Sequence, residues 1–166
     1  VGKIKCFSTF PVDELSIYLD PDMLFMKTIP FKLFEEKADV FLLKRSFDLS
    51  NLMPTTFREL EYPDHKNKSL ENVYPFIACF VILKNQNFWL DCLKYFEKLD
   101  KNYRNWFGDQ EIFKRLVNEN NYKFAFLDEK NFACPPQHLS GKDRPFIVHF
   151  KGKYNKDLIK DYFEFV

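Results

Sequence analysis

The rest of the chain is arranged around one stretch, Ile17-Tyr18-Leu19-Asp20-Pro21-Asp22-Met23-Leu24-Phe25. An apolar run leads into two aspartates and then resumes, which predicts a buried strand that ends at a sheet edge, where Asp20 and Asp22 begin a loop. Ligands of open α/β sheets bind outside the carboxyl ends of strands, so two acids at this point can hold a metal ion. Burying an ionised carboxylate without a partner is very costly. The pair therefore either faces solvent in a turn or binds a cation.

The composition is that of a globular protein, with 166 residues of which 46% are hydrophobic and 30% charged. A chain of this length predicts a single domain, residues 1–166, that buries roughly 70% of its unfolded surface. The 21 Phe and 8 Tyr residues predict a Phe-rich core. A formal net charge of +1 gives no strong field to attract nucleic acid or an anionic membrane.

The cysteines lie far apart and form no CxxC pair, which leaves no basis for a zinc-finger or thioredoxin-like site. Cys79 and Cys92 lie in apolar stretches and are predicted to be buried thiols. No apolar run reaches the roughly 18 residues that a membrane span requires, and no signal-peptide pattern is present. We therefore expect a cytoplasmic chain without a membrane span.

Strand and helix patterns alternate along the chain. Apolar runs of strand length predict strands at 15–19, 23–26, 38–43, 73–83, 124–127 and 145–150. Apolar residues at helical spacing predict helices at 2–10, 29–36, 88–99, from 109 onward, and at 157–165. The segments 46–69 and 131–144 are predicted to be loops. This order predicts an α/β fold in which helices flank a mixed sheet.

Asp20-Pro21-Asp22 is the first of three short segments that can carry chemistry. Hard cations such as Mg²⁺ and Mn²⁺ prefer carboxylate oxygens, and acids at i and i+2 across a tight turn can converge on one ion. Asp and Pro are also ordinary turn formers, so a turn without a ligand remains an alternative.

The second segment is Trp106-Phe107-Gly108-Asp109-Gln110. Asp109 follows a glycine turn and is predicted to cap the next helix, with Trp106 as a hydrophobic anchor. A helix N-terminus that carries Asp-Gln can also face a ligand, so a structural and a functional role are compatible.

The third segment runs from Ile147 to Lys156 and places His149 at the end of a predicted strand. Gly152 allows close backbone approach, and the neighbouring lysines supply positive charge, a combination that suits a diphosphate. A structural histidine followed by a solvated basic turn is the alternative.

In this order, YLDPDM, WFGDQ and IVHFKG resemble the motifs of nucleotide-sugar glycosyltransferases of the GT-A fold, with glycosyltransferase family 8 and its relatives the closest pattern. The resemblance implies metal-dependent transfer of a sugar, with retention, from a nucleotide-diphosphate sugar to a hydroxyl of a glycan or other acceptor. It implies that Mn²⁺ or Mg²⁺ is held by Asp20, Asp22 and His149. It also implies a catalytic centre that contains Asp109 and Gln110, and a diphosphate site made by Gly152 and the lysines Lys151, Lys153 and Lys156.

Three departures from the family pattern concern the ligand-binding parts of the chain. Asn155 stands where the family has a lysine three residues after the glycine. The Asn-x-Gly of the family's central strand is replaced by Ile77-Ala78-Cys79-Phe80. Only one predicted helix and one predicted strand precede Asp20, so we expect the nucleoside-binding βα units to be absent from this chain.

Two other functions fit parts of the pattern. A haloacid-dehalogenase-like Mg²⁺-dependent phosphatase would use Asp20 as nucleophile and Asp22 as acid/base. In that family Thr or Val is expected where this chain has Leu24, and a late pair of acids where it has His149. The second alternative is a non-catalytic GT-A-like domain that binds a glycan or a protein.

Overall fold

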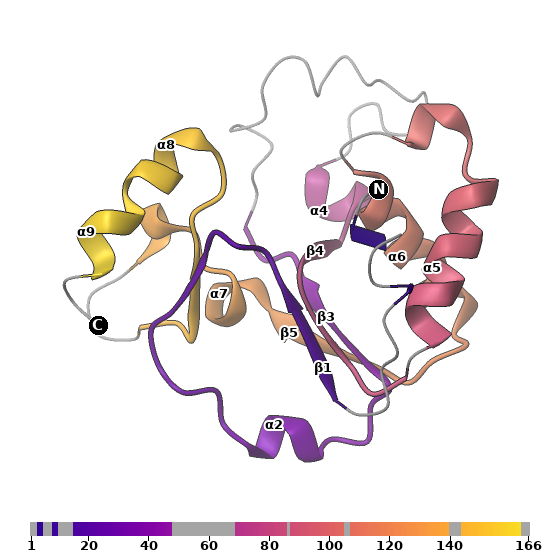
Figure 1. The fold of residues 1–166 in the computed structure, drawn as a ribbon, viewed down its shortest axis with the longest axis horizontal. Helices are drawn as coiled ribbons and strands as arrows, with labels where there is room; N and C mark the ends of the chain where they lie inside the picture. The colour runs from indigo at the N-terminus through magenta and orange to yellow at the C-terminus, as the bar shows by residue number, and fades with distance from the viewer. Residues whose placement is uncertain are drawn as a thin grey trace.

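The computed structural model describes residues 3–4, 8–9, 15–47, 69–85, 87–104, 107–139 and 144–163 (Figure 1). Its main sheet has four strands, which lie in the order β1 (Ser16–Leu19), β4 (Phe76–Leu83), β3 (Val40–Lys44) and β5 (Phe124–Asp128). β1 and β3 both run antiparallel to β4, whereas β5 runs parallel to β3. The sheet is therefore mixed, which confirms the predicted fold class.

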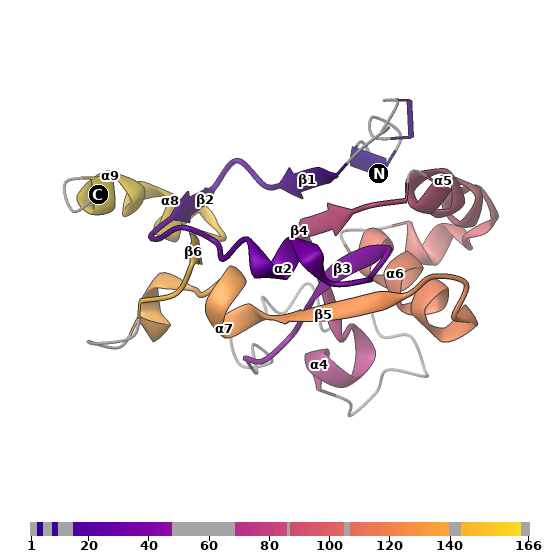
Figure 2. The same ribbon diagram turned by 90° about the horizontal axis from the view of Figure 1, so that it is seen from below.

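A second sheet joins two segments from opposite ends of the chain, β2 (Met23–Phe25) and β6 (Ile147–His149). The strands are antiparallel, and Met23 lies opposite His149. Figure 2 shows this small sheet beside α8 (Lys153–Asp157) and α9 (Ile159–Phe163). The register matters because it brings the end of β6 to the residue that follows Asp22.

Helices cover both faces of the main sheet. α5 (Asn87–Lys98) and α6 (Gly108–Glu119) pack on one face, and α2 (Lys32–Glu35) and α7 (Glu129–Phe132) contribute to the hydrophobic cluster of the other. Shorter helices are α4 (Leu70–Val73) and the 3-10 helices η3 (Lys101–Tyr103) and η4 (Pro136–His138). No helix in the described part of the chain has the length and apolarity needed to cross a bilayer.

β3 shows how the sheet separates two hydrophobic clusters. Its side chains alternate between faces, so Val40 and Leu42 join the cluster under α5 and α6, while Phe41 and Leu43 join the other. All four are fully buried. A strand covered on both faces reads as a continuous apolar run, which is why the sequence pattern identifies it.

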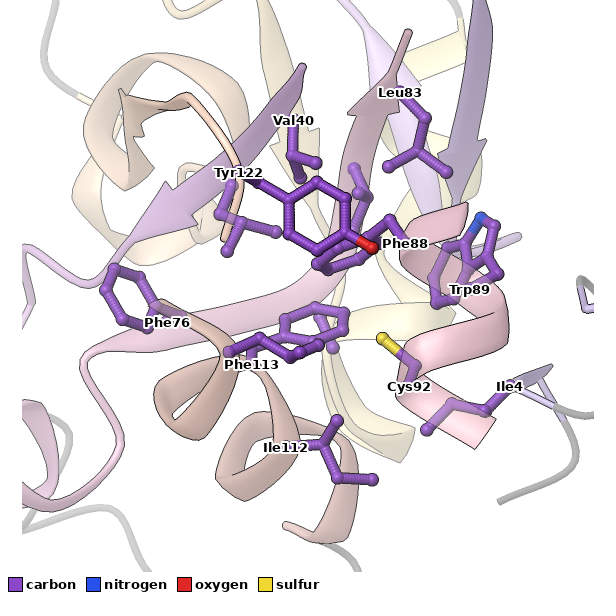
Figure 3. Packing of buried hydrophobic residues seen from close by; sticks show 14 of the residues in the cluster. Ile4, Val40, Phe76, Leu83, Phe88, Trp89, Cys92, Ile112, Phe113 and Tyr122 are labelled. Atoms are coloured by element: carbon purple, nitrogen blue, oxygen red, sulfur yellow. The ribbon is translucent and has the colours of Figure 1, made fainter. Parts of the chain in front are cut away.

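Aromatic rings dominate the cluster between the sheet and α5 and α6 (Figure 3). The ring centroid of Phe88 lies 5.4 Å from that of Phe113 and 5.6 Å from that of Tyr122. Cys92 is buried in the same cluster, and Cys79 is buried on the other side of the sheet. The predicted Phe-rich core and the two buried thiols are thus confirmed.

β1 differs from the prediction in its burial. It was expected to be a buried strand, but among the described strands it pairs only with β4 and lies at the edge of the sheet. Ile17 is accordingly 42% exposed. An apolar run reveals a strand, but the number of its neighbours is set by the tertiary fold.

Several predicted element boundaries were wrong. The strand predicted at 73–83 begins at Phe76, because the residues before Pro75 form α4. The loop predicted at 131–144 contains the end of α7 and all of η4, and the closing helix is divided into α8 and α9. Most of the helix predicted at 2–10 and most of the loop predicted at 46–69 lie outside the described residues, as do residues 164–165.

The substitution Phe113→Ala tests the α5–α6 core. Phe113 is fully buried, so removing its ring should lower the free energy of unfolding by about 3–5 kcal/mol. Phe31→Ala is the matched control, because Phe31 is 75% exposed and the same change there should cost no more than about 0.5 kcal/mol. Urea denaturation followed by circular dichroism measures both, and equal losses would contradict this core.

Candidate functional site

Asp20, Asp22 and His149 meet at the carboxyl end of β1. The Asp20 N–H donates to the Cys79 carbonyl at 2.8 Å, and the Phe150 N–H donates to the Asp22 carbonyl at 2.9 Å. These backbone bonds tie the acidic turn to β4 on one side and to the end of β6 on the other. One potential ligand atom from each of the three side chains lies within 4.8 Å of the other two.

Asp22 is surrounded by groups that can carry positive charge. Lys156 Nζ lies 3.0 Å from Asp22 Oδ2, and His149 Nε2 lies 3.4 Å from Asp22 Oδ1. The contact with His149, followed by that with Lys156, holds the pKa of the Asp22 carboxyl well below its usual range against the opposing effect of burial. Asp22 is therefore a carboxylate, the form that a metal ion requires.

Asp20 is held by Tyr18 and Lys3. The Tyr18 hydroxyl donates to Asp20 Oδ1, and Lys3 Nζ lies 3.7 Å from the same oxygen. Burial, and then the contact with Asp20, raises the pKa of Tyr18, so the phenol stays protonated and remains a donor. Lys3 Nζ also lies 3.1 Å from Asp109 Oδ2 and donates to the Ala78 carbonyl at 2.9 Å. Lys3 thus links the acidic turn to the start of α6.

The donor set of this cluster fits a divalent cation. Carboxylate oxygens suit Mg²⁺ and Mn²⁺, and an imidazole nitrogen is also a transition-metal ligand. Lys3 contacts Asp20, and Lys156 contacts Asp22. The site therefore already holds two positively charged side chains, and a bound cation would add to this charge. The sequence drew attention to the acids and the histidine but not to Lys3, which lies far from them in the chain.

Asp109 and Gln110 lie in the first turn of α6. The helix N-cap is Phe107, so the prediction that Asp109 caps the helix was wrong. Asp109 Oδ1 instead accepts from the adjacent Gln110 N–H at 2.8 Å. A Cβ at Gly108 would lie 2.8 Å from the Tyr103 carbonyl oxygen, so this entry to the helix requires glycine. Trp106 lies outside the described residues.

Gln110 is buried and contacts Arg45, a residue that the sequence analysis did not select. Arg45 Nη2 donates to Gln110 Oε1 at 2.9 Å, and Arg45 Nε donates to the Tyr74 carbonyl at 3.1 Å. Burial lowers the pKa of Arg45, but a guanidinium remains charged in proteins. The sequence does contain one signal for Arg45, since a charged residue that directly follows an apolar strand is the same pattern that identified Asp20.

The segment after His149 divides into residues with different surroundings. Gly152 has φ 88° and ψ 159°, a conformation essentially confined to glycine, and it leads into α8. Lys151 is half-buried, and burial and then the nearby charge of Arg45 lower its pKa. Lys156 is exposed apart from its contact with Asp22. The Lys153 side chain lies outside the described part of the structure.

Known proteins resemble the chain in sequence and in structure. Residues 16–158 match the family model of the nucleotide-diphospho-sugar transferases. The fold is similar to that of the galactosyltransferase LgtC, whose crystal structure holds donor and acceptor sugar analogs, with a TM-score of 0.50 and 13% sequence identity. The similarity covers 91% of this chain and 57% of the LgtC chain. No curated protein matches the chain.

The structural likeness concerns the fold, and the chain spans little more than half of the LgtC length. The family match is broader evidence, because it runs from β1 into α8 and includes the acidic turn, the start of α6 and the end of β6. The chain belongs to the nucleotide-diphospho-sugar transferase family and has a GT-A-type fold.

Proposed function

We propose that this chain forms the metal-binding part of a glycosyltransferase, which moves a sugar from a nucleotide-diphosphate sugar to a hydroxyl of a glycan or other acceptor. The observation that carries the proposal is the convergence of Asp20, Asp22 and His149 at a sheet edge, in a chain of this family. Residues 1–166 would act as one domain. Family membership favours this function over the phosphatase alternative.

The proposed metal ligands are Asp20, Asp22 and His149. When bound, Mn²⁺ or Mg²⁺ supplies Lewis-acid stabilisation of the charge on the departing nucleoside diphosphate. The chain contributes a fixed geometry, because backbone hydrogen bonds on both sides of the acidic turn hold the two carboxylates in place. Such fixed ligands need little rearrangement when the ion binds.

The end of β6 is the proposed diphosphate site. A Cβ at Gly152 would meet no atom within 4 Å, so a ligand can come close to the backbone there. Among the proposed lysines, Lys156 is the best placed, because it is exposed and its ammonium already lies beside Asp22. Lys151 is half-buried near the charge of Arg45 and is less well placed for the diphosphate.

The start of α6 is the proposed sugar- and acceptor-binding part of the site. Lys3 connects Asp109 to Asp20, so the two sequence-identified motifs share one polar network. Asp109 offers a carboxylate that can orient a hydroxyl, and Gln110 offers an amide. These two residues are therefore the proposed catalytic-centre groups of this chain.

Isothermal titration calorimetry with MnCl₂ tests the metal site directly. Wild-type protein should bind Mn²⁺, and Asp22→Asn should weaken binding by at least about tenfold, the smallest loss typical even of outer-shell partners. Glu97→Gln makes the same carboxylate-to-amide change on the exposed surface of α5 and should bind like wild type. Equal affinities in all three proteins would refute the metal site.

Lys156→Met should have opposite effects on two ligands. Lys156 is half-exposed in its contact with Asp22, so removing its competing charge should strengthen Mn²⁺ binding by about threefold. The same variant should weaken binding of UDP or GDP in the presence of Mn²⁺, because the diphosphate loses a cation.

Lys160→Met, an exposed change on α9, is the matched control and should leave both affinities unchanged. A longer protein that includes the nucleoside-binding units but binds no nucleotide sugar would support the non-catalytic alternative. Weaker Mn²⁺ binding in Lys156→Met would contradict the proposed competition between the lysine and the metal.

A further inference from the structure

Arg45 is a buried cation whose side-chain hydrogen bonds, among the described residues, are to neutral oxygens. It follows β3 and is 5% exposed. None of the ion pairs found among the described residues includes it. Its Nη1 is buried without a hydrogen-bond partner. The nearby charges of Glu129 and Glu71 offset part of the cost of burying this guanidinium, but neither carboxylate forms an ion pair with it. Arg45 therefore keeps its directed hydrogen bonds for the Tyr74 carbonyl and the Gln110 amide.

The contact with Arg45 fixes the orientation of the Gln110 amide. A guanidinium has only donors, so the atom that meets Arg45 Nη2 at 2.9 Å must be the oxygen, Oε1. The hydrogen bonds of Arg45 Nε to the Tyr74 carbonyl and of its backbone N–H to the Pro75 carbonyl hold the arginine itself. The amide cannot flip without placing two donors against each other.

The amide nitrogen of Gln110 remains available. No described residue accepts a hydrogen bond from Nε2, yet this atom is not among the buried side-chain atoms without a partner, which are Arg45 Nη1, Glu71 Oε2 and Glu111 Oε2. Solvent therefore reaches Nε2, although Gln110 as a whole is 4% exposed. A buried amide with one open donor is suited to a specific oxygen.

The residue that carries the open donor adjoins the polar network of the acidic turn, because the Gln110 backbone N–H donates to Asp109 Oδ1 at 2.8 Å. Gln110 follows Asp109, whose Oδ2 lies 3.1 Å from Lys3 Nζ, and Lys3 Nζ lies 3.7 Å from Asp20 Oδ1. The positive charge of Arg45 on Oε1 also draws electron density from the amide, which strengthens its N–H groups as donors.

We propose that Arg45 is a positioning residue that makes Gln110 a hydrogen-bond donor to an oxygen of the bound sugar or acceptor. The oxygen of the amide is then engaged by Arg45 and does not serve as an acceptor or a nucleophile in the reaction. The inference rests on the proposed glycosyltransferase function, because that function supplies the sugar oxygen.

The substitution Gln110→Glu separates a donor from an acceptor. Glutamate keeps an oxygen for Arg45 but replaces the amide N–H groups with a second oxygen. We expect its melting temperature to equal or exceed that of wild type. In a longer protein that includes the nucleoside-binding units, its release of nucleoside diphosphate from UDP-, GDP- or ADP-linked glucose or galactose, with Mn²⁺, should fall about 100-fold or more. Gln137→Glu, an exposed change on η4, is the matched control and should keep wild-type rates. Turnover by Gln110→Glu within about threefold of wild type would overturn the inference.

Variants of Arg45 test the positioning role. Arg45→Met should lower kcat with little change in KM, and Arg45→Lys, which keeps the charge and a donor, should restore part of the rate.

A side-chain ¹⁵N spectrum gives a readout that needs no substrate: the Gln110 NH₂ signals should shift and exchange faster in Arg45→Met. If a longer protein that includes the nucleoside-binding units turns over no sugar nucleotide, the proposed function fails, while this spectrum still decides the orientation of the amide. Unchanged Gln110 signals in Arg45→Met would overturn the inference on their own.

Discussion

The structure of the site depends on one electrostatic requirement. Asp20 and Asp22 lie two residues apart at the end of an edge strand, and their negative charges must be compensated by positive charge or hydrogen bonds. Asp20 and Asp22 are both partly buried, and each is compensated from a different part of the chain. The β2–β6 pairing brings His149 to Asp22, α8 brings Lys156, and the N-terminal segment brings Lys3 to Asp20. The small sheet and the C-terminal helices therefore have a clear role, since they complete a charge arrangement that the main sheet alone leaves open.

Lys3 extends this arrangement to the start of α6, where Arg45 makes a second contact. Lys3 contacts the carboxylate of Asp109, and Arg45 contacts the amide oxygen of the next residue, Gln110. Gly108 permits the close approach to the Tyr103 carbonyl with which the helix begins. Two neighbouring side chains at the start of α6, Asp109 and Gln110, are thus each held by a cationic residue. A glycine allows the chain to enter the helix. These contacts hold the Asp109 and Gln110 side chains in fixed positions at the start of the helix.

Local patterns in the sequence predicted the parts of the fold that depend on local interactions. α5, α6 and the central part of β4 follow from hydrophobic periodicity, and Asp20, Asp22 and His149 stand out because polar side chains end apolar strands. The edge position of β1 was missed because burial depends on how many strands pair with it. Lys3 and Arg45 were missed because their partners are distant in the chain, and nothing in their local sequence specifies the contact. The proposed ligands could be identified, but the residues that hold them could not.

The departure of β4 from the family pattern limits what this strand can offer to a ligand. Ala78 has no polar side chain, and burial raises the pKa of the Cys79 thiol, so this thiol stays neutral. The carbonyls of both residues are already used, one by Lys3 Nζ and the other by the Asp20 N–H. The centre of β4 therefore supports the acidic turn but has little left to offer a ligand. For the proposed function, the start of α6 and the end of β6 are then the described segments that offer polar groups to the sugar, which makes the orientation of a single amide at Gln110 consequential.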